Sequence, residues 1–288
     1  MAQLVARLLW EQNAAGSSPV TPTISSVHYK SDGHSFFIHI FLICITTCSS
    51  AQSATDHLDR YLQSCYTDYT ISFIERKPLM KQYTLKIANT VPTDWSDIER
   101  ANVDSYVWGG AERAYKTYGQ LSYAKTNDEK AGLYIHLFCE EKNPVSKERQ
   151  LDGMVCKDSC MEFFFGMHDP NVEDIHYLNI ESNSLGVTFM SFGEERHGRV
   201  FLDALNIDRF PVSVNIGEDG WEVFVFVPET SLKKVFGLSD INENTVMMGN
   251  FYKCDENANA PFGSWAPITA PAPDFHRPEY FGKIIITK

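Results

Sequence analysis

The feature that most constrains the fold of this chain is a period-two alternation of apolar and polar residues that begins near Ile71. Tyr83, Leu85 and Ile87 are separated by polar residues, and the same pattern recurs at short intervals up to the C-terminus. Alternation of this kind, rich in β-branched and aromatic residues, is typical of strands buried on one face. It predicts further strands at residues 133–137, 161–165, 175–181, 187–192, 212–216, 221–227, 246–252 and 283–287.

Helical signals are few. Residues 228–237 begin with Pro and Glu and end with Lys and Gly, which are the preferred ends of a short helix. Residues 94–100 are predicted to form one or two helical turns, and residues 217–220 a hairpin connection. Many strands joined by irregular loops predict an all-β protein, an antiparallel β-sandwich of jelly-roll type with one or two short helices.

The N-terminal 51 residues are predicted to lie outside this domain. Residues 36–45 are apolar but too short to span a bilayer. Ser49 and Ala51 have the small side chains and the spacing that signal peptidase reads, so cleavage is expected after Ala51. Cys48 offers an alternative as a lipoprotein cysteine, although Thr47 precedes it. The mature protein is then secreted, periplasmic or attached to the cell surface, with no transmembrane segment after cleavage.

The first 23 residues add nothing that could fold, and they resemble spurious translations of structural-RNA genes. The true start is therefore expected further along the chain. Residues 1–51 are interpreted as a spurious extension plus a signal peptide, and residues 52–288 as a single β-sandwich domain.

Charge and cysteine content limit the partners. The formal net charge is -12, which argues against nucleic acid or an anionic membrane as a partner. Export permits disulfides between Cys65, Cys139, Cys156, Cys160 and Cys254, but the sequence does not give their connectivity. The spacing of Cys156 and Cys160 has no matching second pair, so it does not predict a zinc site.

The chain ends in a proline-rich segment that holds several aromatic rings. Prolines at this density exclude a helix or a central strand, so the segment is predicted to be an ordered loop. Aromatic and charged side chains on such a loop suggest a recognition surface; alternatively, the rings close one end of the β-core. The prolines are 261, 267, 271, 273 and 278, and the other side chains are Phe262, Trp265, Asp274, Phe275, His276, Arg277 and Tyr280.

Two predicted strands carry polar residues at alternate positions. Glu162 shares a strand face with Phe164, opposite Phe163 and Phe165, and residues 179, 181 and 183 share a face of the next strand. If the two strands are neighbours, Glu162, Asn179 and Glu181 form a cluster of donors and acceptors suited to sugar hydroxyls. The alternative is a solvated outer face of the sheet.

Four segments together resemble the family-9 carbohydrate-binding modules, in particular the family-9-like branch of secreted bacterial proteins. They are residues 158–164 (DSCMEFF), 177–181 (YLNIE), 250–254 (NFYKC) and 273–282 (PDFHRPEYFG), and the resemblance extends over roughly residues 75–288. It implies a β-sandwich that binds sugars, often at the reducing end of a chain and often beside a glycoside hydrolase.

The resemblance also implies the kind of site. In the family two aromatic rings sandwich a sugar, helped by a carboxylate, an amide and an arginine. The carboxylate falls on Glu162, one aromatic ring on Phe275, and the polar positions of the neighbouring strand on Asn179 or Glu181. The other platform tryptophan would precede Asp158, where residues 154–156 are Met-Val-Cys.

Trp108 is the candidate replacement for that tryptophan. The sequence therefore predicts a non-catalytic carbohydrate-binding protein of a polysaccharide-degrading system. Phe275 and Trp108 are predicted to stack on the sugar. Glu162, Asn179, Glu181, His276 and Arg277 are predicted to bond its hydroxyl groups, although Arg277 could instead hold the loop against Asp274 or Glu279.

Other interpretations remain open at this point. Glu162 and Glu181 could form the carboxylate pair of a glycosidase. A structural Ca²⁺ could bind loop carboxylates such as Asp169 or Asp174. A purely structural interaction module without a glycan is also possible. A haem site would need His and Met ligands, for which the candidates are His176, His197, Met190, Met247 and Met248.

Overall fold

The computed structural model describes residues 25–31, 34–40, 80–256 and 261–288. The chain divides into two units, Met1–Glu75 and Arg76–Lys288. In the first, β1 (Ser25–Ser31) pairs with β2 (His34–Ile40) in antiparallel register. The predicted apolar signal run overlaps β2, whereas the predicted cleavage positions, together with Cys48 and Cys65, lie outside the described residues.

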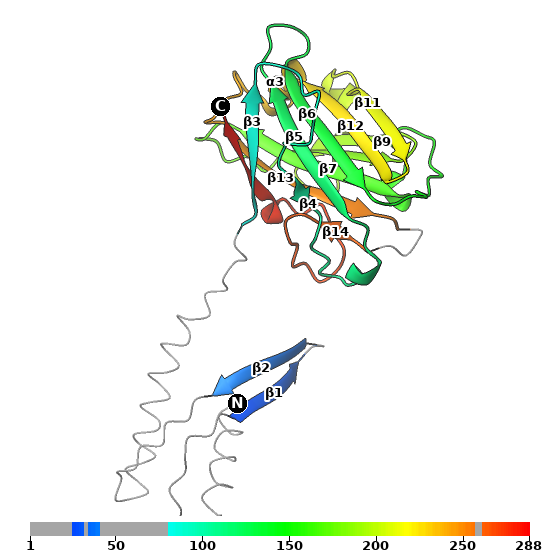
Figure 1. Ribbon diagram of the computed structural model, residues 1–288. Coiled ribbons are helices and arrows are strands. Elements are labelled where there is room, and N and C mark those ends of the chain that lie inside the picture. Colours follow the sequence, from blue (N-terminus) through cyan, green and yellow to red (C-terminus); the bar gives the residue numbers. More distant parts are fainter. Residues whose placement is uncertain (1–24, 32–33, 41–79, 257–260) are drawn as a thin grey trace, which may run out of the picture. The chain divides into compact units, whose positions relative to one another are not determined.

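The second unit is a curled β-sheet whose two halves face each other as a sandwich (Figure 1). The strand order is β10-β9-β8-β7-β13-β15-β3 in one half and β3-β5-β6-β12-β11 in the other. The strands of the first half are β3 (Gln82–Ala88), β7 (Cys160–His168), β8 (Tyr177–Asn183), β9 (Thr188–Gly193), β10 (Val200–Phe201), β13 (Val246–Cys254) and β15 (Gly282–Thr287). Those of the second are β5 (Thr117–Ala124), β6 (Gly132–Cys139), β11 (Val212–Gly217) and β12 (Gly220–Pro228), and the short β4 (Ala101–Asn102) and β14 (Gly263–Ser264) pair with β5 and β13.

The predicted sandwich is confirmed, with one correction to the strand directions. β3 pairs in parallel with β15 and with β5, so the sheet is mixed rather than purely antiparallel. This arises because β3 enters the sheet between two strands that run in its own direction and joins the two halves. The other named strand pairs of this unit are antiparallel.

Every predicted strand is present. β5 is a further strand that the sequence analysis did not predict. Its polar residue Gln120 is only 1% exposed, because the loop over residues 95–98 covers it. The Gln120 amide donates to the carbonyl oxygens of Trp95 and Ile98 at 2.8 and 2.6 Å. The helical turns predicted at residues 94–100 are absent: this segment forms a hydrogen-bonded turn that covers the sheet.

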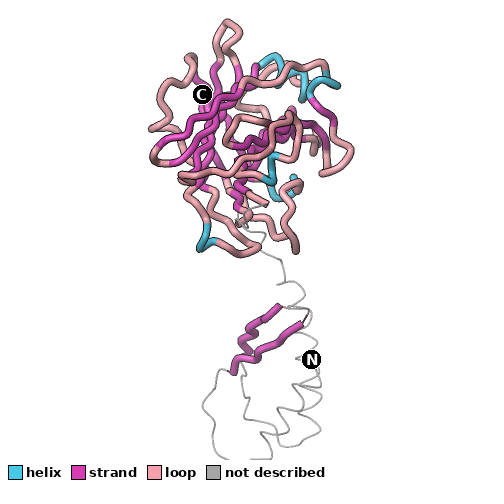
Figure 2. The backbone as a smooth tube through the Cα atoms, turned by 90° about the vertical axis from the view of Figure 1, so that its right-hand side faces the viewer, coloured by secondary structure: helices cyan, strands magenta, loops and turns pink. Residues whose placement is uncertain are grey.

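The helix predicted at residues 228–237 is confirmed as α3 (Glu229–Phe236). It begins directly after Pro228, and it ends at Gly237, whose φ of 66° is the left-handed conformation that glycine adopts most easily. Leu232 and Phe236 face the core. Four short 3₁₀ turns complete the described helical structure, at Ala111–Arg113, Val155–Lys157, Leu202–Leu205 and Pro278–Tyr280 (Figure 2).

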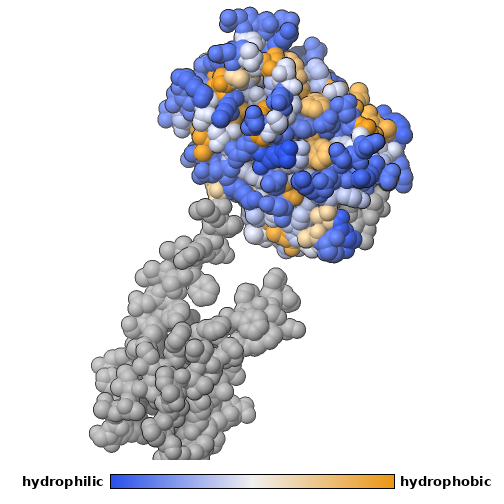
Figure 3. Space-filling model, viewed as in Figure 1, coloured by the Kyte–Doolittle hydropathy of each residue, from blue (hydrophilic) through white to orange (hydrophobic). Residues whose placement is uncertain are grey.

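Two hydrophobic clusters result from this arrangement. The larger one fills the space between the two halves and includes Phe163, Phe165 and Trp221. The smaller one lies on the opposite face of β7, β8 and β13 and is covered by the C-terminal loop, residues 261–281; Phe164 and Phe275 belong to it. The face shown in Figure 3, over β5 and β6, is largely hydrophilic with scattered apolar residues. The candidate site lies instead where the C-terminal loop covers β7, β8 and β13.

Candidate functional site

A pocket of about 70 Å³ lies between the C-terminal loop and strands β7, β8 and β13. It has room for about two water molecules, so a larger ligand would insert an edge rather than be enclosed. Its wall combines aromatic rings, carboxylates, an arginine and thiols. The lining residues are Cys156, Glu162, Phe164, Glu181, Arg196, Cys254, Glu256, Phe262, Pro273, Asp274, Phe275 and His276.

The two polar strands are neighbours, which is the condition that the expected cluster required. In the antiparallel pair of β7 and β8, Glu162 lies directly opposite Glu181, and Phe164 lies opposite Asn179. β13 flanks β7 on the other side and places Tyr252 opposite Glu162. Directly opposed residues on one sheet face have their side chains in contact range. The predicted cluster of Glu162, Asn179 and Glu181 therefore exists, and it lies under the C-terminal loop rather than on a solvated outer face.

The two carboxyl groups are buried, at 2% exposure for Glu162 and 7% for Glu181. The Cys254 thiol donates to Glu162 Oε1 at 3.0 Å, and Asn179 Nδ2 donates to Glu181 Oε1 at 2.7 Å. Burial, and then the nearby Glu181, raise the pKa of Glu162 well above its ordinary value. Burial also raises the pKa of Glu181, to about 7. A carboxyl group that holds its proton can both donate to and accept from a ligand hydroxyl.

Asn179 is fully buried and does not line the pocket. Its Oδ1 accepts hydrogen bonds from Ser191 Oγ at 2.6 Å and from Arg199 Nη2 at 2.8 Å, while its amide nitrogen donates to Glu181. Arg199 also lies over the Tyr177 ring, 4.1 Å from its centroid. Asn179 is therefore a positioning residue that orients Glu181, rather than a group free to bond a sugar.

Phe275 lies in the same pocket as Glu162, so the proline-rich loop folds back over the acidic strand. The Phe275 ring stacks on Tyr252 with centroids 4.2 Å apart and planes at 9°. The Tyr252 hydroxyl donates to the Phe275 carbonyl oxygen at 3.2 Å. Since Phe275 is only 7% exposed, it both closes one end of the sheet and contributes to the pocket wall.

Trp108 lies outside the pocket lining, in contrast to its predicted position. Its indole packs against Phe275 and Phe262, at centroid distances of 6.2 and 6.3 Å, and its Nε1 donates to the Ala270 carbonyl oxygen at 2.8 Å. Trp108 therefore packs against the C-terminal loop and supports it. Phe262, which is half-buried, is the second phenyl ring contributed to the pocket wall by this loop.

His276 and Arg277 differ in their relation to the pocket. His276 lines the pocket, and its Nδ1 lies 2.8 Å from the Tyr177 hydroxyl. Burial, and then nearby arginines, lower the pKa of His276 to about 3, so the ring is neutral at ordinary pH. Arg277 does not line the pocket; it pairs with Glu279 at 2.7 Å. Arg277 thus takes the structural role that the sequence left open as an alternative.

The main polar residue missed by the sequence analysis is Arg196. It belongs to the loop between β9 and β10, and its Nη2 lies 2.7 Å from Asp274 Oδ1 in the C-terminal loop. This pair connects two loops across the pocket. The only sequence signal is the basic segment 196–199 shortly after β9, and it does not reveal which arginine reaches the pocket.

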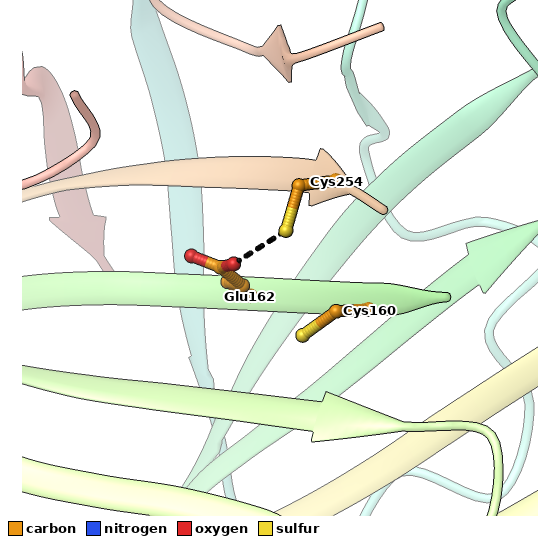
Figure 4. A group of neighbouring side chains, drawn as sticks. All are labelled: Cys160, Glu162 and Cys254. Carbon is orange, nitrogen blue, oxygen red and sulfur yellow. Dashed lines mark hydrogen bonds between the residues drawn. The ribbon is translucent and has the colours of Figure 1, made fainter. Parts of the chain in front are cut away.

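The other predicted ligand sets are not brought together. Met190 and Met247 are buried in the larger hydrophobic cluster, and His176 is held by Asp174 and Glu194. In the part of the chain that the structure describes, neither Asp169 nor Asp174 belongs to a group of side chains with metal-ligand spacing. In the described part of the chain, the group with metal-ligand spacing is instead Cys160, Glu162 and Cys254 (Figure 4).

The chain belongs to carbohydrate-binding family 9, whose model matches residues 90–286. The match includes every residue of the pocket. It establishes the chain as a non-catalytic carbohydrate-binding module, as predicted. No curated protein matches the chain.

The chain is similar to several solved structures. A proposed carbohydrate-binding protein from Bacteroides uniformis superposes with a TM-score of 0.58 at 20% identity, covering 73% of this chain and 100% of that one. A family-9 module from Caldicellulosiruptor kristjanssonii in complex with cellotriose has a TM-score of 0.48 at 12% identity, covering 72% and 93% of the two chains. The same kind of module in complex with glucose has a TM-score of 0.47 at 14% identity, covering 72% and 96%.

Proposed function

We propose that the pocket under the C-terminal loop is the sugar-binding site of this module. The observation that carries the proposal is that Phe275 and Glu162, which are far apart in the sequence, line one pocket. A sugar ring has apolar C–H faces and a polar rim, so it requires an aromatic surface beside hydrogen-bonding groups. This pocket combines both.

In this account Phe262 and the accessible edge of Phe275 contact the C–H face of a terminal sugar. Glu162, Glu181, His276 and Arg196 bond its hydroxyl groups. Each net hydrogen bond contributes about 1 kcal/mol and each aromatic contact a similar amount. Two or three of each give a dissociation constant on the order of micromolar to millimolar, which suits a tethering module. The small volume favours one sugar unit at a chain end over an internal stretch of polysaccharide.

The module is further proposed to act outside the cytoplasm, after cleavage near Ala51 or, alternatively, lipid attachment at Cys48. It would act alongside glycoside hydrolases that degrade the bound polysaccharide. The small residues at the predicted cleavage positions support export. Among the described residues, no helix has the length and apolar character needed to cross a membrane. Amino-terminal sequencing of the protein recovered from its native host tests the cleavage.

A glycan array probed with residues 52–288, followed by calorimetry on the best neutral oligosaccharide, tests the binding site. The informative variant is Phe262→Ala, because this ring is half-buried and its loss leaves the Phe275–Tyr252 stack in place. The matched control is Tyr115→Ala, which removes an aromatic ring that is 43% exposed and lies outside the pocket.

The proposal predicts that Phe262→Ala weakens binding by about tenfold, equal to about 1.4 kcal/mol, while Tyr115→Ala leaves it unchanged. Both variants should keep the far-ultraviolet circular dichroism of the parent. Equal sugar affinity of the parent and Phe262→Ala would show that the sugar does not bind in this pocket. Absence of binding to any glycan would favour a structural interaction module.

A further inference from the structure

Two cysteines and a carboxylate meet beneath the pocket (Figure 4). Cys160 and Glu162 are two residues apart on β7, so their side chains share one sheet face. Cys254 is the register partner of Cys160 on β13. The two sulfur atoms and a carboxylate oxygen of Glu162 all lie within 4.8 Å of one another, and all three residues are buried.

We propose that Cys160, Glu162 and Cys254 form a binding site for a thiophilic divalent cation of the zinc type. Two thiolates and one carboxylate are a donor set that Zn²⁺ accepts, with Zn–S bonds of about 2.3 Å and Zn–O bonds of about 2.0–2.2 Å. In a tetrahedral site these bond lengths place neighbouring donor atoms about 3.5–3.8 Å apart. The observed spacing therefore needs only small side-chain rotations to close around an ion.

The hydrogen bond within the cluster supports this assignment. The Cys254 thiol donates a hydrogen bond to Glu162 Oε1 at 3.0 Å. The sulfur and oxygen atoms that would bind the ion therefore already lie side by side. Binding of a cation at that point would release the thiol protons of Cys160 and Cys254 and the carboxyl proton of Glu162 to solvent.

The position of the cluster gives the ion a route of entry and a fourth ligand. Glu162 and Cys254 line the pocket, whereas Cys160 does not. A fourth ligand would then come from the pocket side, either a water molecule or the half-buried Cys156, which also lines the pocket. An open position of this kind would also let a sugar hydroxyl contact the ion, but the metal site itself does not depend on sugar binding.

Cobalt(II) titration of the chelator-treated full chain tests the proposal, because Co²⁺ substitutes for Zn²⁺ and reports thiolate ligands by its charge-transfer absorption. The expected result is one ion per chain with a thiolate band. Cys160→Ser and Cys254→Ser should each lower the intensity of that band, and Glu162→Gln should weaken Co²⁺ binding by more than about tenfold. The matched control is Cys139→Ser, because Cys139 is a buried free cysteine in the other hydrophobic cluster and should not matter.

A second measurement needs no variant and remains informative if the serine variants fail to fold. X-ray absorption of the zinc-loaded parent protein should show at least two sulfur neighbours at about 2.3 Å, together with a shell of oxygen. An oxygen and nitrogen shell without sulfur would overturn the proposal. So would a cobalt thiolate band of unchanged intensity in folded Cys160→Ser and Cys254→Ser. A Cys160–Cys254 disulfide, found by peptide mass mapping of protein purified without reductant, would also overturn it.

Discussion

The ring of Phe275 lies flat on the ring of Tyr252, with centroids 4.2 Å apart and planes at 9°. Tyr252 belongs to β13, and Phe275 belongs to a loop that begins after that strand. This contact therefore holds the C-terminal loop over the sheet and forms one wall of the pocket. Because Tyr252 is the register partner of Glu162, the same contact fixes the loop above the buried carboxylates.

Phe275→Ala should lower the free energy of unfolding by about 3–5 kcal/mol, the range typical of a buried phenylalanine that leaves a cavity. Urea denaturation followed by tryptophan fluorescence measures the change. Phe201→Ala is the matched control: Phe201 is 41% exposed, so its loss should cost less than about 1 kcal/mol. Similar losses in the two variants would mean that Phe275 does not hold the loop.

Trp108→Leu tests whether the Trp108 indole supports the C-terminal loop or stacks on the sugar. The substitution removes the hydrogen bond to the Ala270 carbonyl oxygen and the contacts with Phe262 and Phe275, so it should lower stability by about 1–3 kcal/mol. Sugar affinity, measured by calorimetry below the unfolding temperature, should change by less than about threefold. A loss of affinity in the folded variant that is as large as that of Phe262→Ala would place the Trp108 indole on the sugar.

His276 should make stability depend on pH on the acid side. Its pKa is lowered to about 3 in the folded protein, against an ordinary value of 6.5, because burial disfavours the charged ring. The unfolded chain therefore takes up a proton below pH 6.5 that the folded chain takes up only near pH 3. The neutral His276 therefore costs the folded protein no stability above pH 6.5. As the pH falls from 6.5 toward 3, the free energy of unfolding decreases by an amount on the order of a few kcal/mol.

His276→Asn tests this, because the asparagine oxygen can replace Nδ1 as acceptor for the Tyr177 hydroxyl without titrating. Denaturation curves at pH 7 and pH 4 should show a smaller loss of stability for the variant than for the parent. His197→Asn is the control, since His197 is exposed. The account of His276 fails if the parent and His276→Asn lose equal stability between these two values.

Arg199→Lys should be far more damaging than Arg277→Lys. The Arg199 guanidinium donates to Asn179 Oδ1 and to the Tyr177 carbonyl oxygen, both at 2.8 Å, and a lysine cannot reproduce this geometry. We expect a loss of about 2–3 kcal/mol for Arg199→Lys. Arg277 pairs with the exposed Glu279, and such surface pairs contribute about 1 kcal/mol or less. Thermal unfolding of both variants, with equal effects as the contradicting result, distinguishes the two arginines.

Much of the fold could be predicted because period-two alternation reports directly which strand face is buried. The same rule predicted that Glu162 and Phe164 share a face and that Asn179 and Glu181 share another. The unpredicted strand β5 shows where the rule fails: Gln120 reads as an exposed position, yet the loop over residues 95–98 buries it by accepting its hydrogen bonds.

The site could be predicted only as far as local pattern extends. Glu162 and Phe275 were identified from their motifs, and the structure places both in the pocket. Arg196 and Cys254 reach the pocket through loop conformation and through the register between β7 and β13, and neither is encoded in local spacing. For the same reason, the cysteine spacing of residues 156 and 160 did not reveal Cys254 as the partner of Cys160.

The central claim, that the pocket under the C-terminal loop binds the sugar, is tested most directly by a crystal structure of the protein with its best glycan from the array. We predict a terminal sugar with its C–H face against Phe262 and Phe275 and its hydroxyl groups within hydrogen-bonding distance of Glu181 and Arg196. A sugar bound on another face of the sandwich, with this pocket holding only water, would contradict the account.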